Sequence, residues 1–308
     1  MATKVKSSFS PCAARGGNSW SRERVTGGSG ARPRSIRRHM PALYAMPSSL
    51  VLLLAVIVAV ALACGGQLLV HRLVGNAHFL DDNDLNGYIS GTIVTLFAVL
   101  IGFVTVIVWQ QYDSMRDRVA AEASDVAAVW HDAVGLPPQA RRAVRRDMLA
   151  YVDLMIGVEW PAMRSGGASP KGAAYIMDAT TDVGGMDAKT NTESNAQAAI
   201  IGLLNGLHAQ RDQRLEANVS PAVSPFMWTI MLFGAAVVIV FCYMFGASHR
   251  TTHLVMTGLV AAVTASMLVL TFELQYPFRG DLGISPSVWT ALRAHIEDMD
   301  AHMPAMRM

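Results

Sequence analysis

The stretch DDNDLNGYISGTIVTLFAVLIGFVTVIVWQQYDSMRDRVAAE, residues 81–122, decides the fold of this chain. It begins with acids and turn-forming residues, continues as an apolar run, and ends in a segment with apolar residues at helical spacing. Residues 87–108 contain no Asp, Glu, Lys, Arg or His. At about 1.5 Å per residue, a helix of that length crosses the roughly 30 Å hydrocarbon core of a bilayer. The stretch therefore predicts a transmembrane helix that continues into water.

One face of this predicted helix consists of small and hydroxyl side chains in steps of three and four residues. Contact with lipid requires no such stripe, so we expect the face to meet something else. Packing against another helix is one interpretation, because Gly, Ala and Thr let backbones approach closely. A path through an oligomer, lined by the threonines, is the other. The face comprises Gly87, Gly91, Thr95, Ala98, Gly102, Thr105 and Trp109, and the opposite side carries Ile93, Phe97, Leu100, Phe103 and Ile107.

Three other apolar runs have the same length. Of 308 residues, 52% are hydrophobic and only 16% are charged, which is not a soluble composition. Each run has about the 20 residues that a transmembrane helix needs. The sequence predicts an all-α integral membrane protein with four transmembrane helices. We expect these helices at about residues 50–70, 87–109, 226–246 and 253–272.

Lysine and arginine lie almost entirely on one predicted side of the membrane. Of 25 such residues, 23 precede the first span, lie between spans two and three, or follow span four, and Arg72 and Arg250 are the exceptions. The positive-inside rule therefore predicts that both termini lie in the cytoplasm. We expect the protein to span the plasma (bacterial inner) membrane. The net charge of +2 gives no argument for a nucleic-acid partner.

The N-terminal segment leaves alternatives open. Residues 1–46 are basic and lack an apolar period, which predicts a disordered tail. Their composition is also typical of a targeting segment, and Met40 or Met46 would fit a later start. Arg37-Arg38 and the run that ends at Cys64 resemble a lipoprotein signal, but the apolar run continues to Val70, which favours a retained helix.

The long segment between spans two and three predicts a cytoplasmic antiparallel helical domain. The second span's helix should continue to Pro137-Pro138, followed by helices at 139–157 and 193–217. One turn is expected over Trp160-Pro161 and Ser165-Gly166-Gly167, and another at Gly184-Gly185. The first of these two helices carries Arg141, Arg142, Arg145 and Arg146, which suits a solvated face, anionic headgroups or an anion vestibule. The resulting boundaries are 1–46 (tail), 47–112 (first helix pair), 113–224 (helical domain), 225–273 (second helix pair) and 274–308 (C-terminal tail).

Side chains with ligand chemistry form no convincing site, and we expect no cofactor. Asp82, Asp84 and Asn86 match the first positions of a calcium loop, but the twelfth position is Ile93 rather than an acid. A cap for the second span is the better interpretation of Asp84 or Asn86.

Three other polar features of the spans have simple structural interpretations. His249 and His253 lack the adjacent Glu of a zinc hydrolase, so we expect them at the membrane interface. Glu273 ends the fourth span, where its charge should reach water. The small residues of the fourth span suit close helix packing; they are Gly258, Ala261, Ala262 and Ala265.

Short motifs follow one another in three groups along residues 50–290. The first group is Asp82-Asn83, Gly102-Phe103, Trp109-x-x-Tyr112 and Glu122-Ala123. The second group is Glu159-Trp160-Pro161-Ala162-Met163, Ser169-Pro170 and Arg211-x-x-Arg214-Leu215. The third group is Pro225-x-x-Trp228, Phe245-Gly246 with His253, and Pro277-Phe278-x-Gly280 with Ser285-Pro286. In this order the motifs resemble the bestrophin-like family of bacterial membrane proteins.

This resemblance extends distantly to the bestrophins, which are pentameric anion channels. It implies four membrane helices and a pore lined by the second. The family-motif residues that it singles out as site candidates are Tyr112, Trp160, Pro161, Pro277, Phe278 and Gly280. The chain departs from bestrophins after Pro277-Phe278, where Asp281 stands alone in place of the several acids of their calcium site. Calcium gating is therefore not expected.

The sequence supports two classes of function. No GxxxxGK[ST], GxSxG or HExxH motif is present, so no enzyme is predicted. A homo-oligomeric ion channel, assembled in the bilayer through the second span, is the first hypothesis. The alternative is a membrane-anchored interaction protein whose cytoplasmic helices bind a protein partner and which transports nothing.

Overall fold

The computed structural model describes residues 44–74, 83–246 and 249–302, and every regular element among them is helical. The four apolar runs lie in α2, α4, α9 and α10, which confirms the prediction of four helices long and apolar enough to cross a membrane. The elements in chain order are α2 (Ser48–Val74), α4 (Asn83–Asp132), a 3₁₀ turn (Ala133–Gly135), α5 (Pro138–Leu154), a π-helical turn (Met155–Glu159), α6 (Trp160–Arg164), α7 (Lys171–Gly184), α8 (Asn191–Val219), α9 (Pro225–Tyr243), α10 (Arg250–Leu274) and α11 (Ser287–His302).

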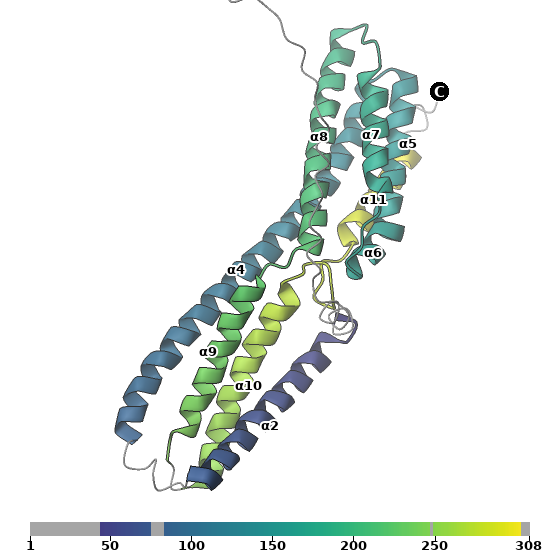
Figure 1. The fold of residues 1–308 in the computed structure, drawn as a ribbon. Helices are drawn as coiled ribbons and strands as arrows, with labels where there is room; N and C mark the ends of the chain where they lie inside the picture. The colour runs from purple at the N-terminus through teal and green to yellow at the C-terminus, as the bar shows by residue number, and fades with distance from the viewer. Residues whose placement is uncertain (1–43, 75–82, 247–248, 303–308) are drawn as a thin grey trace, which may run out of the picture.

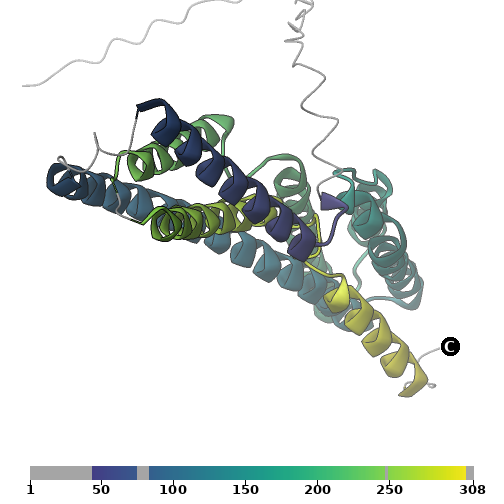
Figure 2. The ribbon, with the colours of Figure 1, turned by 90° about the horizontal axis from the view of Figure 1, so that it is seen from below.

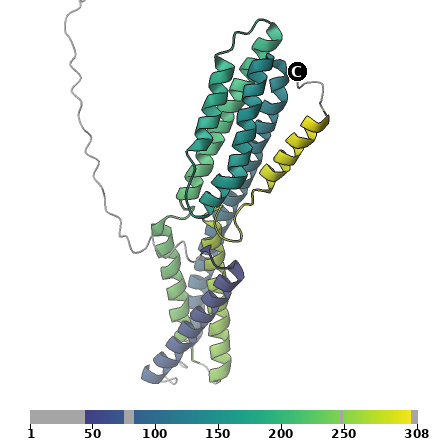
Figure 3. The same ribbon diagram turned by 90° about the vertical axis from the view of Figure 1, so that its right-hand side faces the viewer.

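The helix α4 connects two parts of the molecule. Its 50 residues make it about 75 Å long at 1.5 Å per residue. Its N-terminal half packs with α9 and α10, and α2 packs on these two helices; we call α2, α9, α10 and this half of α4 the membrane part (Figure 1). Its C-terminal half, from Met115 onward, packs with α5, α8 and α11, and α7 packs on α5 and α8; we call this group the helical bundle (Figures 1 and 3).

Each part has its own hydrophobic core. In the bundle, residues such as Val126, Met148 and Leu204 are completely buried. In the membrane part, α4 presents Ile101 and Val108 to the buried Met231 and Val238 of α9. The predicted small face of α10 is confirmed, because a Cβ on Gly258 would lie 3.5 Å from Val60 of α2.

The chain path differs from the sequence-based expectations in two places. The predicted turn over Trp160-Pro161 and Ser165-Gly166-Gly167 forms only in its second part, at Gly166, whose φ of 78° requires glycine. Before it, the chain passes from α5 through the π-helical turn directly into α6, with Pro161 in its first turn. The helix α7 was not predicted, although Ile176, Ala179 and Val183 line its buried side.

Two polar residues of the spans also lie elsewhere than expected. Glu273 is buried rather than in water, and Ser48 Oγ at the start of α2 donates to its Oε2 at 2.9 Å. Asn86 is not a cap, because α4 begins three residues earlier and the Asn86 amide donates to the Met244 carbonyl of α9 at 2.9 Å. In both cases a second helix comes close enough to satisfy the polar group.

The expected aromatic face of the second span is divided in two. Phe97 is buried against α9, where the backbone of Gly234 allows its ring to approach, whereas Phe103 is 67% exposed. A Cβ added to Gly234 would lie 2.5 Å from Phe97 Cδ2. This contact sets the spacing between α4 and α9.

We predict that Gly234→Ala destabilises the protein, whereas Gly65→Ala, on an open face of α2, does not. Alanine should stabilise an exposed helical position by about 0.5–1 kcal/mol relative to glycine. At position 234 overpacking against Phe97 should outweigh this gain and cost about 1–3 kcal/mol. Thermal unfolding of the two variants in one detergent measures the difference. Equal melting temperatures would show that α4 and α9 are not in tight contact there.

Candidate functional site

One face of α4 remains uncovered in the membrane part. The helices α2, α9 and α10 lie on one side of α4, as the view from the membrane end shows (Figure 2). The covered face carries Phe97, Ile101, Val104 and Val108, all less than a tenth exposed. The uncovered face carries most of the predicted stripe, namely Gly87, Gly91, Thr95, Ala98, Gly102 and Trp109.

Thr105 departs from this stripe. It is half-buried, and its hydroxyl lies 3.1 Å from that of Thr271 on α10 and 2.8 Å from the carbonyl of Ile101. Thr95 is exposed, and its hydroxyl donates back to the Gly91 carbonyl at 2.7 Å. The face available to another molecule is therefore polar at Thr95 but not at Thr105.

The stripe is open rather than packed. A Cβ added to Gly91 or Gly102 would meet no heavy atom within 4 Å. A hollow of about 530 Å³ lies at the first part of the stripe, next to the exposed Tyr88. It is lined by Gly87, Tyr88, Gly91, Thr92, Thr95 and Leu96. The small residues therefore do not serve packing inside one chain.

The weak calcium motif gains no support from the described residues. Asp82 lies outside them, as does the side chain of Asp84. Asn86 uses its amide on the Met244 carbonyl. Elsewhere in the described chain, His, Cys, Asp and Glu side chains form no group of three at metal-binding distance.

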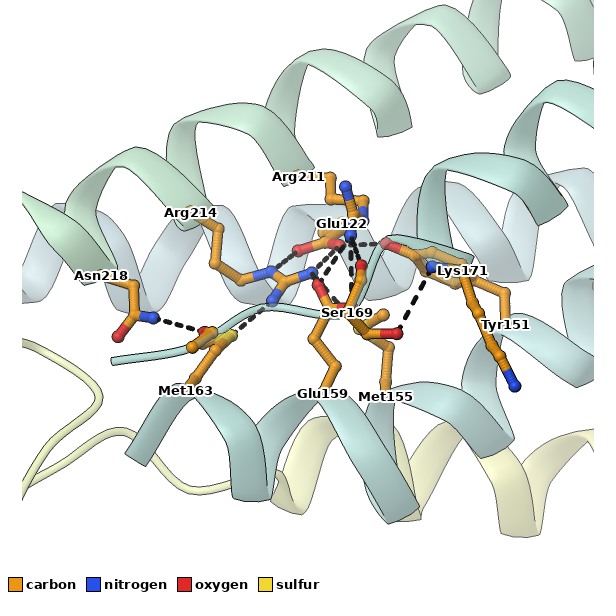
Figure 4. Close-up of polar contacts among 11 residues, drawn as sticks. Glu122, Tyr151, Met155, Glu159, Met163, Ser169, Lys171, Arg211, Arg214 and Asn218 are labelled. Atoms are coloured by element: carbon orange, nitrogen blue, oxygen red, sulfur yellow. Dashed lines mark hydrogen bonds and ion pairs between the residues drawn. The ribbon is translucent and has the colours of Figure 1, made fainter. Parts of the chain in front are cut away.

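A buried cluster of charged motif residues lies where the helical bundle begins. Four charged side chains from three segments meet there, each less than a twentieth exposed (Figure 4). Arg214 of α8 donates to Glu122 of α4 at 2.7 and 3.1 Å and to Glu159 of the π-helical turn at 3.1 Å. Arg211 donates to the same Glu159 at 3.1 Å and to the Ser169 carbonyl at 2.7 Å. Two acids and two bases give a neutral buried network.

Tyr151 completes this network. Its hydroxyl donates to Glu122 at 2.5 Å. Burial, and then the Glu122 charge, raise the pKa of Tyr151 well above its ordinary value, so the hydroxyl keeps its proton. Burial works against the charge on Arg214, but the neighbouring Glu122 leaves its pKa raised overall. Both shifts favour a neutral Tyr151 hydroxyl and a charged Arg214 guanidinium.

Local backbone features bring these groups together. The π-helical turn adds one residue to the helix turn between Met155 and Glu159 and directs Glu159 at α8. Gly172 at the start of α7 leaves room for Arg211, because a Cβ there would lie 2.7 Å from its Nε. Thr190 starts α8 with a capping box to Glu193, which fixes the register that presents both arginines.

The family-motif residues of the C-terminal segment pack against those of α4 and α6, beside this network. Trp160 donates to the Ile284 carbonyl at 2.9 Å and meets the ring of Phe278 edge-on at 5.6 Å. Tyr112 donates to the Leu282 carbonyl at 2.7 Å. Gly280 has a φ of 70°, which reverses the chain between these contacts. Pro277 is buried in the same turn, whereas Pro161 is exposed.

The basic helix α5 has a structural explanation. Arg141 donates to the carbonyls of Val134 and Leu136, and Arg145 donates to that of Trp130. These arginines therefore cap the C-terminal end of α4 and its 3₁₀ turn. Arg146 pairs with Asp147 on its own helix. Contact with headgroups is not needed to account for them.

We predict that Arg214→Ala costs about 3–5 kcal/mol of stability, because it leaves two buried carboxylates without their cation. Arg293→Ala is the matched control, since Arg293 pairs with Asp153 at 2.8 Å on the surface. Its loss should cost about 0–1 kcal/mol. Chemical or thermal unfolding of both variants measures the difference, and losses of equal size would contradict a structural role for the network.

The geometry defines a class: an all-helical protein with four apolar helices suited to a membrane, one long helix shared with a second bundle, and an uncovered small-residue face. The family model named Bestrophin-like domain matches residues 57–289, and the chain belongs to this family. No curated protein matches its sequence.

Solved structures share the fold. A single-residue variant of a bacterial bestrophin homologue from Klebsiella pneumoniae superposes with a TM-score of 0.57 at 12% identity, covering 81% of this chain and 98% of the other. A second variant of that homologue gives 0.54 at 13% identity, covering 84% and 100%. At such identities the likeness concerns the fold alone.

Proposed function

We propose that this protein is a homo-oligomeric ion channel in which the N-terminal halves of several α4 helices line the path. The observation that carries the proposal is the uncovered stripe of Gly91, Thr95 and Gly102 on α4, whose other face packs against α9 and α10. A helix exposed only to lipid has no use for such a stripe. The bestrophin-like family and fold support a channel over other classes.

The chemistry of the stripe suits passage rather than binding. Residues 87–108 carry no charged side chain. Thr95 and the glycines offer hydroxyl and backbone dipoles, which select ions without holding them tightly. The exposed aromatic rings of Tyr88 and Trp109 lie near the two ends of the stripe. In an oligomer they would narrow both ends of the path.

We infer the orientation from charge. The helical bundle carries the arginines between spans two and three, which supports a cytoplasmic position for it, for both termini and for the 113–224 segment of a protein in the bacterial inner membrane. The segment boundaries 47–112 and 225–273 then enclose the two helix pairs of the membrane part.

We predict that Gly102→Leu and Thr95→Leu each reduce ion flux by an order of magnitude or change ion preference, while leaving the protomer folded. A leucine at position 102 has open space within one chain, so any effect must arise between chains. Purified protein in liposomes, assayed under anion and cation gradients, measures flux. Gly65→Leu is the control, because Gly65 also meets no neighbour but lies on α2.

The outcomes separate the two hypotheses. Reduced flux with unchanged oligomer size supports a path along the stripe, whereas a smaller oligomer makes the stripe an assembly surface. Native protein that conducts no ion under any gradient overturns the channel and favours the interaction protein. An equal effect of Gly65→Leu overturns the role of α4.

A further inference from the structure

The uncovered face of α4 continues beyond the membrane part. The helix runs without a break into the helical bundle (Figure 1). Asp113 follows Thr95 by about five full turns at 3.6 residues per turn, so the two side chains leave α4 on the same side. Asp113, Asp117 and Ser124 are all exposed. The face that carries the small-residue stripe therefore extends past Trp109 toward the bundle, and its chemistry changes there.

Acids occupy the middle of this extension. Residues 87–112 contain no Asp, Glu, Lys, Arg or His, so Asp113 is the first charged residue of α4 after the apolar run. Asp117 lies one turn farther along the same side. Among the described residues, neither carboxylate accepts a hydrogen bond or forms an ion pair. Both charges therefore face outward from the single chain.

The two arginines of this segment are turned to the sides. Arg118 donates to Gln213 of α8. Arg116 follows Tyr112 by one turn and lies on the side on which Tyr112 meets the C-terminal segment. Neighbouring residues of a helix point about 100° apart, so the arginines flank Asp117 instead of covering it. The charges of the segment cancel in sum, but their placement leaves the middle of the face negative.

We propose that Asp113 and Asp117 make this protein selective for cations. The inference rests on the ion channel proposed above and names the class of ion that it conducts. In a closed symmetric oligomer each copy contributes the same pair, so the carboxylates form rings at the bundle end of the path. Rings of Asp or Glu side chains favour cations in pores.

The acids, and not the stripe, decide the sign of the ion. The hydroxyl of Thr95 and the backbone dipoles of Gly91 and Gly102 can serve either sign. The carboxylate rings lie next to the apolar walls of the path, which focus their field. They raise the concentration of cations, and lower that of anions, before an ion reaches Trp109.

The range of this field depends on the salt concentration. The Debye length is about 10 Å at 0.1 M salt, which is roughly two turns of helix, and about 3 Å at 1 M. A preference that comes from exposed charges must therefore weaken as salt rises. A preference that comes from the width of the path does not.

Zero-current potentials in planar bilayers test the inference on the full chain. Under a KCl gradient, the sign of the potential shows whether K⁺ or Cl⁻ permeates better. We expect the native protein to prefer K⁺ severalfold near 0.1 M KCl and to lose most of this preference near 1 M. The double substitution Asp113→Asn with Asp117→Asn should conduct, with its K⁺ to Cl⁻ ratio severalfold lower at the lower salt concentration.

A second pair of acids provides the matched control. Asp178 of α7 and Asp187 after it are exposed, and α7 packs on α5 and α8. Asp178→Asn with Asp187→Asn changes the net charge by the same amount away from the uncovered face of α4. We expect this variant to keep the native ratio.

The results separate this inference from the proposed function. A salt-dependent K⁺ preference that is lost only in the Asp113 and Asp117 variant supports it. A native protein that conducts but prefers Cl⁻ overturns the inference and leaves the channel in place. A K⁺ preference that persists in that variant, or is lost equally in the control, also overturns it. Native protein without any conductance overturns the channel and this inference together.

Discussion

The pairing of Arg214 with Glu122 and Glu159 is the interaction on which the rest of the structure depends (Figure 4). It joins α4, the π-helical turn and α8 at a buried site, where the loss of one partner leaves an unpaired buried charge. All of its hydrogen bonds can form in only one alignment of the three segments. Because Trp160 follows Glu159 directly, the same register fixes the surface on which Phe278 and Ile284 dock. The C-terminal segment is thus held by the bundle, and also by the start of α2, where the Ser48 amide donates to Asp281 at 3.1 Å.

The helix α4 has different surroundings on the two sides of this network. In the bundle it is packed on several sides, with Val126 and Val129 fully buried. In the membrane part it is covered on one side only. A single chain therefore completes the bundle but leaves the membrane part incomplete. This asymmetry is the physical argument for assembly through α4.

Local features were predictable from sequence, and contacts between distant segments were not. The four spans and the small stripe follow from composition and period, which are properties of adjacent residues. The half-burial of Thr105 and the burial of Glu273 depend on Thr271 and Ser48, which are remote in sequence. Glu159 and Arg211 stood out as motif residues, but their partnership required the π-helical turn. The helix α7 lies between the two expected turns and was missed, although Ile176, Ala179 and Val183 recur at helical spacing along its buried side.

The continuity of α4 gives the molecule a mechanical property. A rigid rod about 75 Å long that pivots near its middle by about 5° displaces its far end by roughly 3 Å. Transmembrane helices change tilt when bilayer thickness changes. The bundle is fastened to one half of the rod, so a change in tilt of the other half would move the bundle. In an assembly of several copies these movements would add symmetrically, and the protein would respond to the physical state of its lipid as well as to any ligand.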